Sequence, residues 1–221
     1  MLITSKWKYE DLEGGANFSS LAFDGRFFFL AGLKAVYIYS KDFERLDFVQ
    51  TPEISTLCYD NGEDCFWAAA ASGREILKLS RRFDELARIG LDRAVYDLSY
   101  FCAHDSLLAA TACGIIEICK HADMREIRAV SGHFNVLAIA PFYAIHEKDS
   151  ICFYAPDGIL HSTLFIPKDH EVLDILFYHP ENELLALARP KSGKGARILR
   201  HPMPCMDICD CNYTIPKTCV L

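Results

Sequence analysis

The sequence repeats one six-residue hydrophobic frame five times at a nearly constant spacing. The five copies are Phe18–Phe23, Ile54–Tyr59, Val95–Tyr100, Phe134–Ile139 and Val172–Phe177, with steps of 36, 41, 39 and 38 residues. A period of this length is typical of a repeat protein, in which each repeat is one structural unit that packs on its neighbours. The frame constrains the architecture of the chain strongly, whereas the sequence carries no catalytic signature that would constrain its chemistry.

Each copy of the frame is followed by polar turns and three further short runs. In the first unit these are Phe27–Ala31, Ala35–Tyr39 and a run that begins in Lys41–Leu46. Runs of about 4–8 residues that are rich in Phe, Tyr, Ile and Val and end at turn residues favour strands over helices. The pattern predicts that each unit is a four-stranded antiparallel meander.

Four short strands in each unit of about 40 residues is the pattern of a propeller blade. The segment Phe177–Ala186 is similar to the strand, turn and strand common in WD40-like propellers, and the chain resembles the β-propeller class over about residues 17–204. No unit carries the Gly-His and Trp-Asp signatures of WD40 repeats, so the resemblance names no specific family. It implies an all-β fold, a five-bladed β-propeller of four-stranded antiparallel blades.

We expect a single domain over residues 1–221 that is closed by the chain termini. The expected blades are residues 17–53, 54–94, 95–133, 134–171 and 172–213. Residues 3–9 and 205–213 are spare strand-like segments, and one or both should complete the fifth blade. The alternative is six blades, one of them split, because 17 residues precede Phe18 and 17 follow Pro204.

Charge and hydropathy exclude some partners. The chain has 30 acidic and 23 basic residues, a net charge of −7, and no dense basic stripe. Nucleic-acid binding relies on clustered Lys and Arg, so we expect no nucleic-acid partner. The first residues lack the apolar run of a signal peptide, and no segment approaches the ~20 apolar residues that span a bilayer. We therefore expect a cytoplasmic protein with no membrane association.

Ten cysteines in such a chain indicate small buried hydrophobes rather than disulfides. The cysteines within strand-like runs, all expected in the core, are Cys58, Cys65, Cys102, Cys113, Cys119 and Cys152. In the tail, Cys205 and Cys209 of an extended strand would lie ~13 Å apart, too far for one zinc ion. Only Cys209 and Cys211 could share a metal, and we expect instead a packed closing strand with no metal or cofactor.

Two carboxylates occupy the same place in different units. Position three of the frame holds Asp97 and Asp174 in the third and fifth units, and Ser20, Thr56 and Val136 in the others. A glycosidase needs two carboxyl groups ~5–9.5 Å apart. The five-bladed hydrolases use an acidic residue from each of three early blades, and here the first two blades offer none at this position. A hydrolase or lyase acting on a carbohydrate-like substrate is therefore the alternative, and we expect each Asp to accept backbone hydrogen bonds.

The glycines and lysines of Pro190–Gly195 could form a phosphate-binding nest. The Walker spacing and the helix that should follow it are both absent. The segment is predicted to be a solvated hairpin turn between the second and third strands of the fifth blade.

The resemblance also implies where a ligand would bind. In propellers, the loops that enter each first strand and those that join strands two and three gather on one face around the central channel. The residues expected on that face are Asn17, Arg74, Arg93, Tyr96, His133, Asn135, Glu147 and His170. They differ in every unit, which favours one asymmetric site or a protein-contact surface over repeated sites.

We expect a non-enzymatic binding or scaffold propeller that engages a protein or a small ligand at this channel face. Position three, where the repeat is least regular, is the place where the sequence favours a site. The sequence does not specify an oligomeric state.

Overall fold

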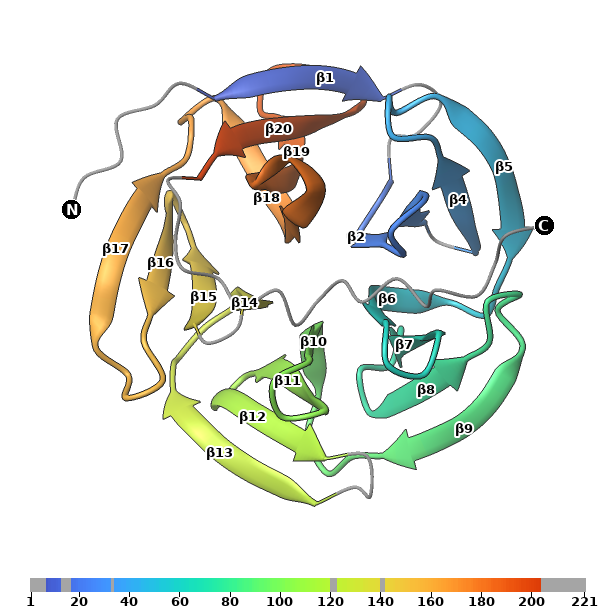
Figure 1. The fold of residues 1–221 in the computed structure, drawn as a ribbon, viewed down its shortest axis with the longest axis vertical. Coiled ribbons are helices and arrows are strands. Elements are labelled where there is room, and N and C mark those ends of the chain that lie inside the picture. The colour runs from blue at the N-terminus through green and yellow to red at the C-terminus, as the bar shows by residue number, and fades with distance from the viewer. Residues whose placement is uncertain (1–6, 13–16, 33, 120–122, 140–141, 204–221) are drawn as a thin grey trace.

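Each of the five repeat units folds into one four-stranded antiparallel sheet, and the five sheets form a ring (Figure 1). The computed structural model describes residues 7–12, 17–32, 34–119, 123–139 and 142–203. The predicted all-β, five-bladed propeller is confirmed, and the six-bladed alternative is wrong.

The first three blades are continuous in sequence and run from the innermost to the outermost strand. Blade one comprises β2 (Ser20–Phe23), β3 (Phe28–Ala31), β4 (Ala35–Tyr39) and β5 (Arg45–Gln50). Blade two comprises β6 (Ile54–Asp60), β7 (Cys65–Ala70), β8 (Glu75–Leu79) and β9 (Glu85–Gly90). Blade three comprises β10 (Val95–Phe101), β11 (Ser106–Thr111), β12 (Gly114–Cys119) and β13 (Met124–Ala129).

The fifth blade is closed by a strand from the other end of the chain. Blade four comprises β14 (Asn135–Ile139), β15 (Phe142–Glu147), β16 (Ser150–Tyr154) and β17 (Leu160–Phe165). Blade five comprises β18 (His170–Tyr178), the short 3-10 helix η1 (His179–Glu181), β19 (Glu183–Pro190), β20 (Ala196–Pro202) and, outermost, β1 (Lys8–Leu12).

Closure by the N-terminal strand agrees with the prediction, although the strand lies further along the chain than residues 3–9. The pairing runs from Lys8 opposite Arg200 to Leu12 opposite Ala196. The other segment expected to contribute, residues 205–213, lies outside the described residues.

The hydrophobic core is divided into five clusters, each between two neighbouring blades. The cluster between blades one and two, for example, joins Phe29 and Val36 to Phe66 and Leu77. The other four clusters join blades two and three, three and four, four and five, and five and one. Both faces of every blade are therefore covered by neighbours, as expected for a unit that cannot bury its apolar surface alone.

A β-bulge recurs at the start of the first strand in three blades. The register between the first and second strands shifts between Ile54 and Thr56, between Val95 and Asp97, and between Val172 and Asp174. The residue at position two of the frame is the extra residue at each bulge. A bulge re-aims the side chain of the extra residue and increases the local twist.

Blade four has no such bulge, and its frame is one residue shorter than the sequence pattern suggests. Asn135 pairs directly with His146 and Val136 with Ile145, without a shift. Val136 therefore takes the structural place that Leu57 and Leu98 hold in their blades. The sequence alignment that put Val136 at position three is wrong by one residue, and Asn135 is the true occupant of that position.

The turn at residues 190–195 joins β19 to β20, where the hairpin was predicted. The prediction that six strand cysteines lie in the core is wrong for most of them, because only Cys58 and Cys65 are buried. The half-buried or exposed ones lie mainly at strand ends and turns: Cys102, Cys113, Cys119 and Cys152. Within the described ranges, no helix has the length and apolar character needed to cross a bilayer.

Candidate functional site

The residues at position three of the frame form a belt of hydrogen bonds between successive blades. The Ser20 hydroxyl accepts from the backbone N–H of Leu57 at 2.9 Å, and the Thr56 hydroxyl donates to Asp97 Oδ1 at 2.8 Å. With the corrected alignment, the belt consists of Ser20, Thr56, Asp97, Asn135 and Asp174. Each is polar, and each bonds to a neighbouring blade.

The belt continues around the rest of the ring. Asp97 Oδ2 accepts from the Val136 N–H at 2.8 Å, and the Asn135 side-chain amide donates to the Leu173 carbonyl at 3.0 Å. Asp174 Oδ2 accepts both the Ser20 hydroxyl and the Leu21 N–H, each at 2.6 Å. Position three therefore holds the blades together, and only Asn135 of this position lines the pocket described below.

The two carboxylates of the belt are close to each other but closed to solvent. Contacts of 2.6, 3.4 and 2.8 Å connect Asp174 to Asp97 through the hydroxyls of Ser20 and Thr56. These contacts keep the two carboxyl groups closer together than the ~9.5 Å upper limit of glycosidases, so distance does not exclude a hydrolase. Burial argues against a hydrolase function for this pair, because Asp97 is 2% and Asp174 is 4% exposed. No substrate can reach oxygens that already bind backbone and hydroxyl groups.

Burial also changes the acidity of both groups. Removal from water raises the pKa of Asp97 to about 6, although hydrogen bonds from Thr56 and Val136 oppose the shift. Burial and the nearby Asp97 raise the pKa of Asp174. These shifts follow from the structural role of the belt, because desolvation disfavours a charged carboxylate.

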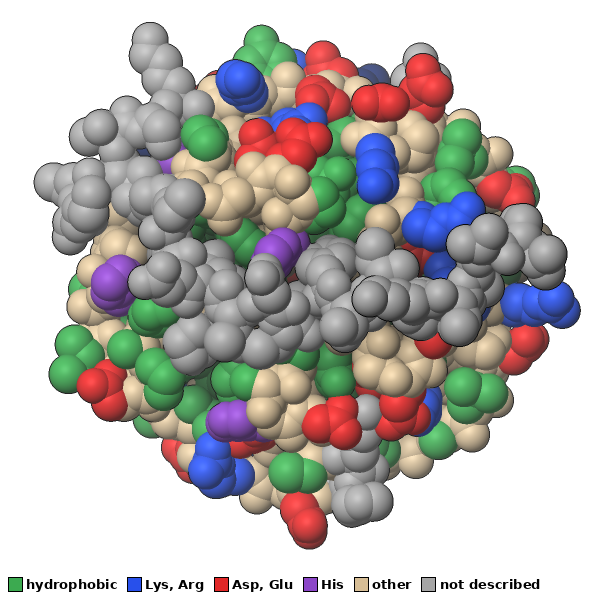
Figure 2. Space-filling view, in the orientation of Figure 1, with side chains coloured by type: hydrophobic (Ala, Val, Ile, Leu, Met, Phe, Trp, Pro, Cys, Tyr) green, Lys and Arg blue, Asp and Glu red, His purple; other side chains and the backbone are tan. Residues whose placement is uncertain are grey.

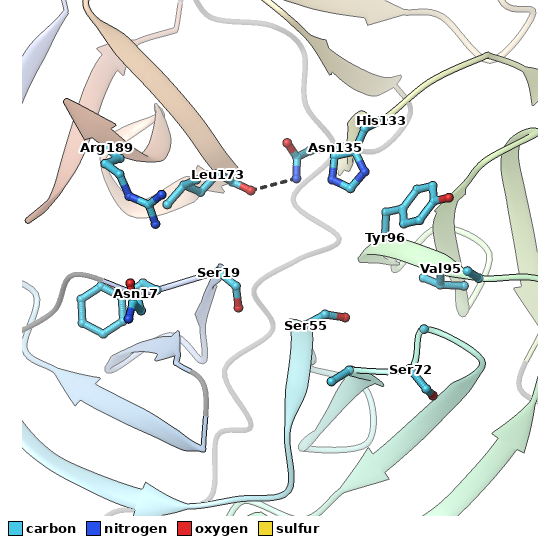
Figure 3. Close-up of a pocket in the computed structure, with 14 residues that line it drawn as sticks. Asn17, Ser19, Ser55, Ser72, Val95, Tyr96, His133, Asn135, Leu173 and Arg189 are labelled. Atoms are coloured by element: carbon cyan, nitrogen blue, oxygen red, sulfur yellow. Dashed lines mark hydrogen bonds between the residues drawn. The ribbon is translucent and has the colours of Figure 1, made fainter. Parts of the chain in front are cut away.

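A pocket of about 480 Å³ lies at one mouth of the central channel (Figure 3). It is lined by Asn17, Phe18, Ser19, Ser55, Ala71, Ser72, Gly73, Ala94, Val95, Tyr96, His133, Asn135, Leu173 and Arg189. The lining comes from the starts of the first strands and from the hairpins between second and third strands. Ligand pockets commonly have volumes of about 300–1,000 Å³.

The bulges place side chains in this pocket. Ser55, Tyr96 and Leu173 are the extra residues of the three bulges, and all three line the pocket. Blade one contributes Ser19 from the same frame position. Blade four, which lacks the bulge, contributes Asn135 instead. Position two is thus the position that faces the channel mouth, one residue before the belt.

Asn135 belongs to both the belt and the pocket, and its orientation is held at both ends. Its Oδ1 lies 2.8 Å from Nδ1 of His146, and its Nδ2 donates to the Leu173 carbonyl. Burial lowers the pKa of His146, which favours the neutral ring. The other ring nitrogen, Nε2, lies 3.3 Å from the Lys148 carbonyl, so the imidazole is fixed on both sides and holds the Asn135 amide in one orientation.

Two opposite sides of the pocket differ in chemistry. The rings of Tyr96 and His133 lie 4.7 Å apart between centroids and tilted by 41°, forming an aromatic wall. Across the pocket the guanidinium of Arg189, from β19, points inward (Figure 3). Arg189 Nη1 lies 4.0 Å from Glu171 Oε2, and both side chains of this pair are solvent-exposed.

Half of the residues that the sequence placed on the channel face line this pocket. They are Asn17, Tyr96, His133 and Asn135. Among the others, Arg93 pairs with Asp92 at 3.0 Å, and Arg74 and Glu147 are exposed outside the pocket. His170 is buried in blade five, with Nδ1 2.9 Å from Asp169. Ligand binding by any of these residues remains a prediction.

The pocket also contains polar residues that the sequence pattern did not predict. They are Ser19, Ser55, Ser72 and Arg189. Ser19 and Ser55 could have been found from position two of the frame, which varies as much as position three. Ser72 belongs to a hairpin turn, where small polar residues are ordinary, and Arg189 lies at the end of β19; neither position carries a signal of its own in the sequence.

Within the described residues, no group of three or more His, Cys, Asp or Glu could hold a metal ion. The alternative metal ligands Cys209 and Cys211 lie outside those residues. Acidic and basic side chains are interspersed around the face of the ring shown in Figure 2.

Comparison with known proteins gives the fold and little else. No protein-family model and no curated protein sequence matches the chain. Its structure is similar to that of hydrazine synthase from Kuenenia stuttgartiensis, with a TM-score of 0.53, 10% identity and coverage of 79% of this chain. The chain spans 56% of the length of that protein.

A second similar structure is that of Hsv2 from Kluyveromyces lactis, solved with its complete loop 6CD. The TM-score is 0.47 at 12% identity, over 78% of this chain and 70% of that chain. At such identities a likeness extends to the fold alone, because unrelated functions share one fold. The fold of this chain is that of a β-propeller with five blades.

Proposed function

We propose that this propeller is a binding module that holds a small polar ligand in the pocket at the channel mouth. The observation that carries the proposal is the convergence of position two from all but one blade on a single pocket, with Asn135 taking that place in blade four. The side chains brought there differ from blade to blade. One asymmetric ligand fits such a lining better than a set of equivalent ligands.

The size and rigidity of the pocket support a small ligand. Its volume of about 480 Å³ lies in the range of small-molecule sites. The strands below it are fixed by the hydrogen-bonded belt, and Asn135 is held by His146. A lining that is ordered before binding loses little entropy on binding.

A hydrolase function finds no support in the same geometry. The carboxylates considered for it, Asp97 and Asp174, are buried in the belt below the pocket, and their oxygens accept backbone and hydroxyl hydrogen bonds. They stabilise the ring of blades. The ligand would instead meet neutral hydroxyls, amides and the Arg189 guanidinium.

The test is a thermal-shift screen of the protein against sugars, sugar acids, hydroxy acids and amino acids. A ligand at ~100 times its Kd adds roughly 2.7 kcal/mol to the free energy of unfolding. The variants Ser55→Trp and Ser72→Trp fill the pocket from a strand and from an exposed hairpin, and Arg82→Trp at an exposed turn is the control. Melting without ligand checks that each variant folds.

A compound that stabilises the wild type and Arg82→Trp, but neither pocket variant, supports the proposal. Equal stabilisation of all four proteins places the site elsewhere and overturns it. A screen without any shift also overturns the small-ligand function and leaves a protein partner at the channel face as the next hypothesis.

A further inference from the structure

We propose that the ligand of this pocket is a ring-shaped hydroxy acid, a uronic acid being one example. In this arrangement Arg189 binds the carboxylate, the aromatic wall of Tyr96 and His133 packs on the ring, and the serines bond its hydroxyl groups. The inference rests on the proposed function and adds the chemical class of the ligand.

The charge of the lining selects an anion. Among the described residues that line the pocket there is no Asp or Glu, and Arg189 is the sole Lys or Arg. Neutral donors and acceptors make up the rest of the polar surface. An anionic group would meet one cation and no lining carboxylate, whereas a cation would find no opposite charge in the lining.

Arg189 is placed to bind a carboxylate. Its side chain is 40% exposed and that of its neighbour Glu171 is 60% exposed, with 4.0 Å between the closest charged atoms. An exposed pair at this distance contributes little free energy, so a ligand can displace it. A guanidinium binds a carboxylate through two parallel hydrogen bonds, which fixes orientation as well as charge.

The aromatic wall lies opposite Arg189 and sets the shape of the ligand (Figure 3). Tyr96 comes from the bulge of β10 and His133 from the segment that enters β14, and their rings are 4.7 Å apart. Each presents a flat apolar surface with a polar edge. A ring with its carboxylate at the far end can contact the wall and Arg189 together.

Hydroxyl groups on the ligand ring are favoured by the polar side chains that lie between the aromatic wall and Arg189. Ser55 projects from β6, Ser72 from the β7–β8 hairpin, and Asn17 and Ser19 from the segment before β2. A hydroxyl both donates and accepts, as does a ligand hydroxyl, so the two can pair in either direction. Ser19 and Ser55 already donate to the Ala31 and Ala69 carbonyls at 3.5 and 3.4 Å, so their oxygens remain able to accept from a ligand hydroxyl. An aromatic acid without hydroxyls would gain none of these hydrogen bonds.

The experiment is isothermal titration calorimetry of the full chain with galacturonate and glucuronate, each matched with the neutral sugar galactose or glucose. We expect a uronate to bind and its neutral partner to bind about ten- to hundredfold more weakly, the range expected for losing a hydrogen bond to a charged group. Arg189→Gln should lose the same factor for the uronate. Arg82→Gln, at an exposed turn outside the pocket, should lose nothing.

The remaining outcomes separate this inference from the proposed function. If a neutral sugar binds as tightly as its acid, or if both Arg variants bind equally, the anionic class is wrong while the pocket remains a binding site. If neither uronate binds, the ring-shaped hydroxy acid is overturned, and the pocket-filling variants in the broader screen decide the proposed function independently. Acetate serves as the control for a carboxylate without a ring and should not bind measurably.

Discussion

Asp97 on blade three accepts the backbone N–H of Val136 on blade four at 2.8 Å, so one buried carboxylate joins two repeats of the propeller. Its other oxygen accepts the hydroxyl of Thr56 on blade two. Three successive blades therefore depend on one side chain. The same position in the other blades does similar work, and Asp97 is suited to a test of the belt because both of its oxygens bond to other blades.

Replacing Asp97 with Ala should destabilise the fold by about 2–4 kcal/mol. The variant leaves a buried N–H and a buried hydroxyl without their acceptor, and each such group costs roughly 1–3 kcal/mol. Asp97→Asn is the matched control, because its amide oxygen can still accept from Val136 and its NH₂ can donate to Thr56. It should cost ~1 kcal/mol or less. Urea unfolding followed by circular dichroism measures both, and equal losses would show that the belt contributes little.

The contribution of Asp97 to stability should fall as the pH rises from about 4 to about 6. The pKa of Asp97 is raised to about 6 in the folded protein, against ~3.9 in the unfolded chain. Over this interval the folded state binds more protons, so the free energy of unfolding decreases with pH. Asp174 acts in the same direction because burial raises its pKa as well.

The difference between wild type and Asp97→Asn isolates this contribution from all other titrating groups. Urea unfolding at pH 4, 5, 6 and 7 should show the wild type losing about 2–3 kcal/mol relative to the variant across the series. Parallel curves would mean that Asp97 has its ordinary pKa in the folded protein.

Gly114→Ala should destabilise blade three by more than about 2 kcal/mol. Gly114 has a φ of +144°, and a Cβ built there would lie 2.1 Å from the backbone oxygen of Arg128. Gly90→Ala is the control, because a Cβ at Gly90 meets nothing within 4 Å. Thermal melting of the two variants should separate them clearly, and similar melting temperatures would contradict the close approach of β12 and β13.

The ion pairs of Arg200 should stabilise the closing strand. Its guanidinium lies 2.8 Å from Glu10 of β1 and 2.7 Å from Glu183, and the side chain is 17% exposed. A double-mutant cycle with Glu10→Gln and Arg200→Gln should give a coupling free energy of about 1 kcal/mol, the upper end for partly exposed pairs. The exposed pair of Arg88 and Glu85, within one strand, is the control and should show no measurable coupling. If the Arg200 pair shows none either, these ion pairs do not stabilise the closing strand.

The blades could be predicted from the sequence because their determinants are local and repeated. Leu21, Leu57 and Leu98 recur at one frame position since each must enter a cluster against the preceding blade. Turn residues after each frame mark where the chain reverses. These requirements act on every repeat, so the period of the sequence is enough to predict the blades.

The site was only partly predictable, because it depends on a single residue of register. A bulge adds one residue to a strand without changing its hydrophobic character, and blade four lacks it. The alignment of hydrophobic residues therefore placed Val136 where Asn135 belongs, since a shift of one residue exchanges the two faces of a strand. The same uncertainty concealed the fact that the pocket is lined by position two in four blades and by Asn135, at position three, in blade four.

Pairing of β1 with β20 has a consequence for how the chain reaches this structure. The hydrogen bond from Arg200 to Glu10 joins residues 190 apart in sequence. Contacts of such high sequence separation form late, because the entropy of closing the loop is lost before the contact stabilises anything. We expect the first four blades to assemble first, as an open ring. Until β1 docks, this intermediate has an unpaired strand edge and is the state of the chain most prone to aggregation.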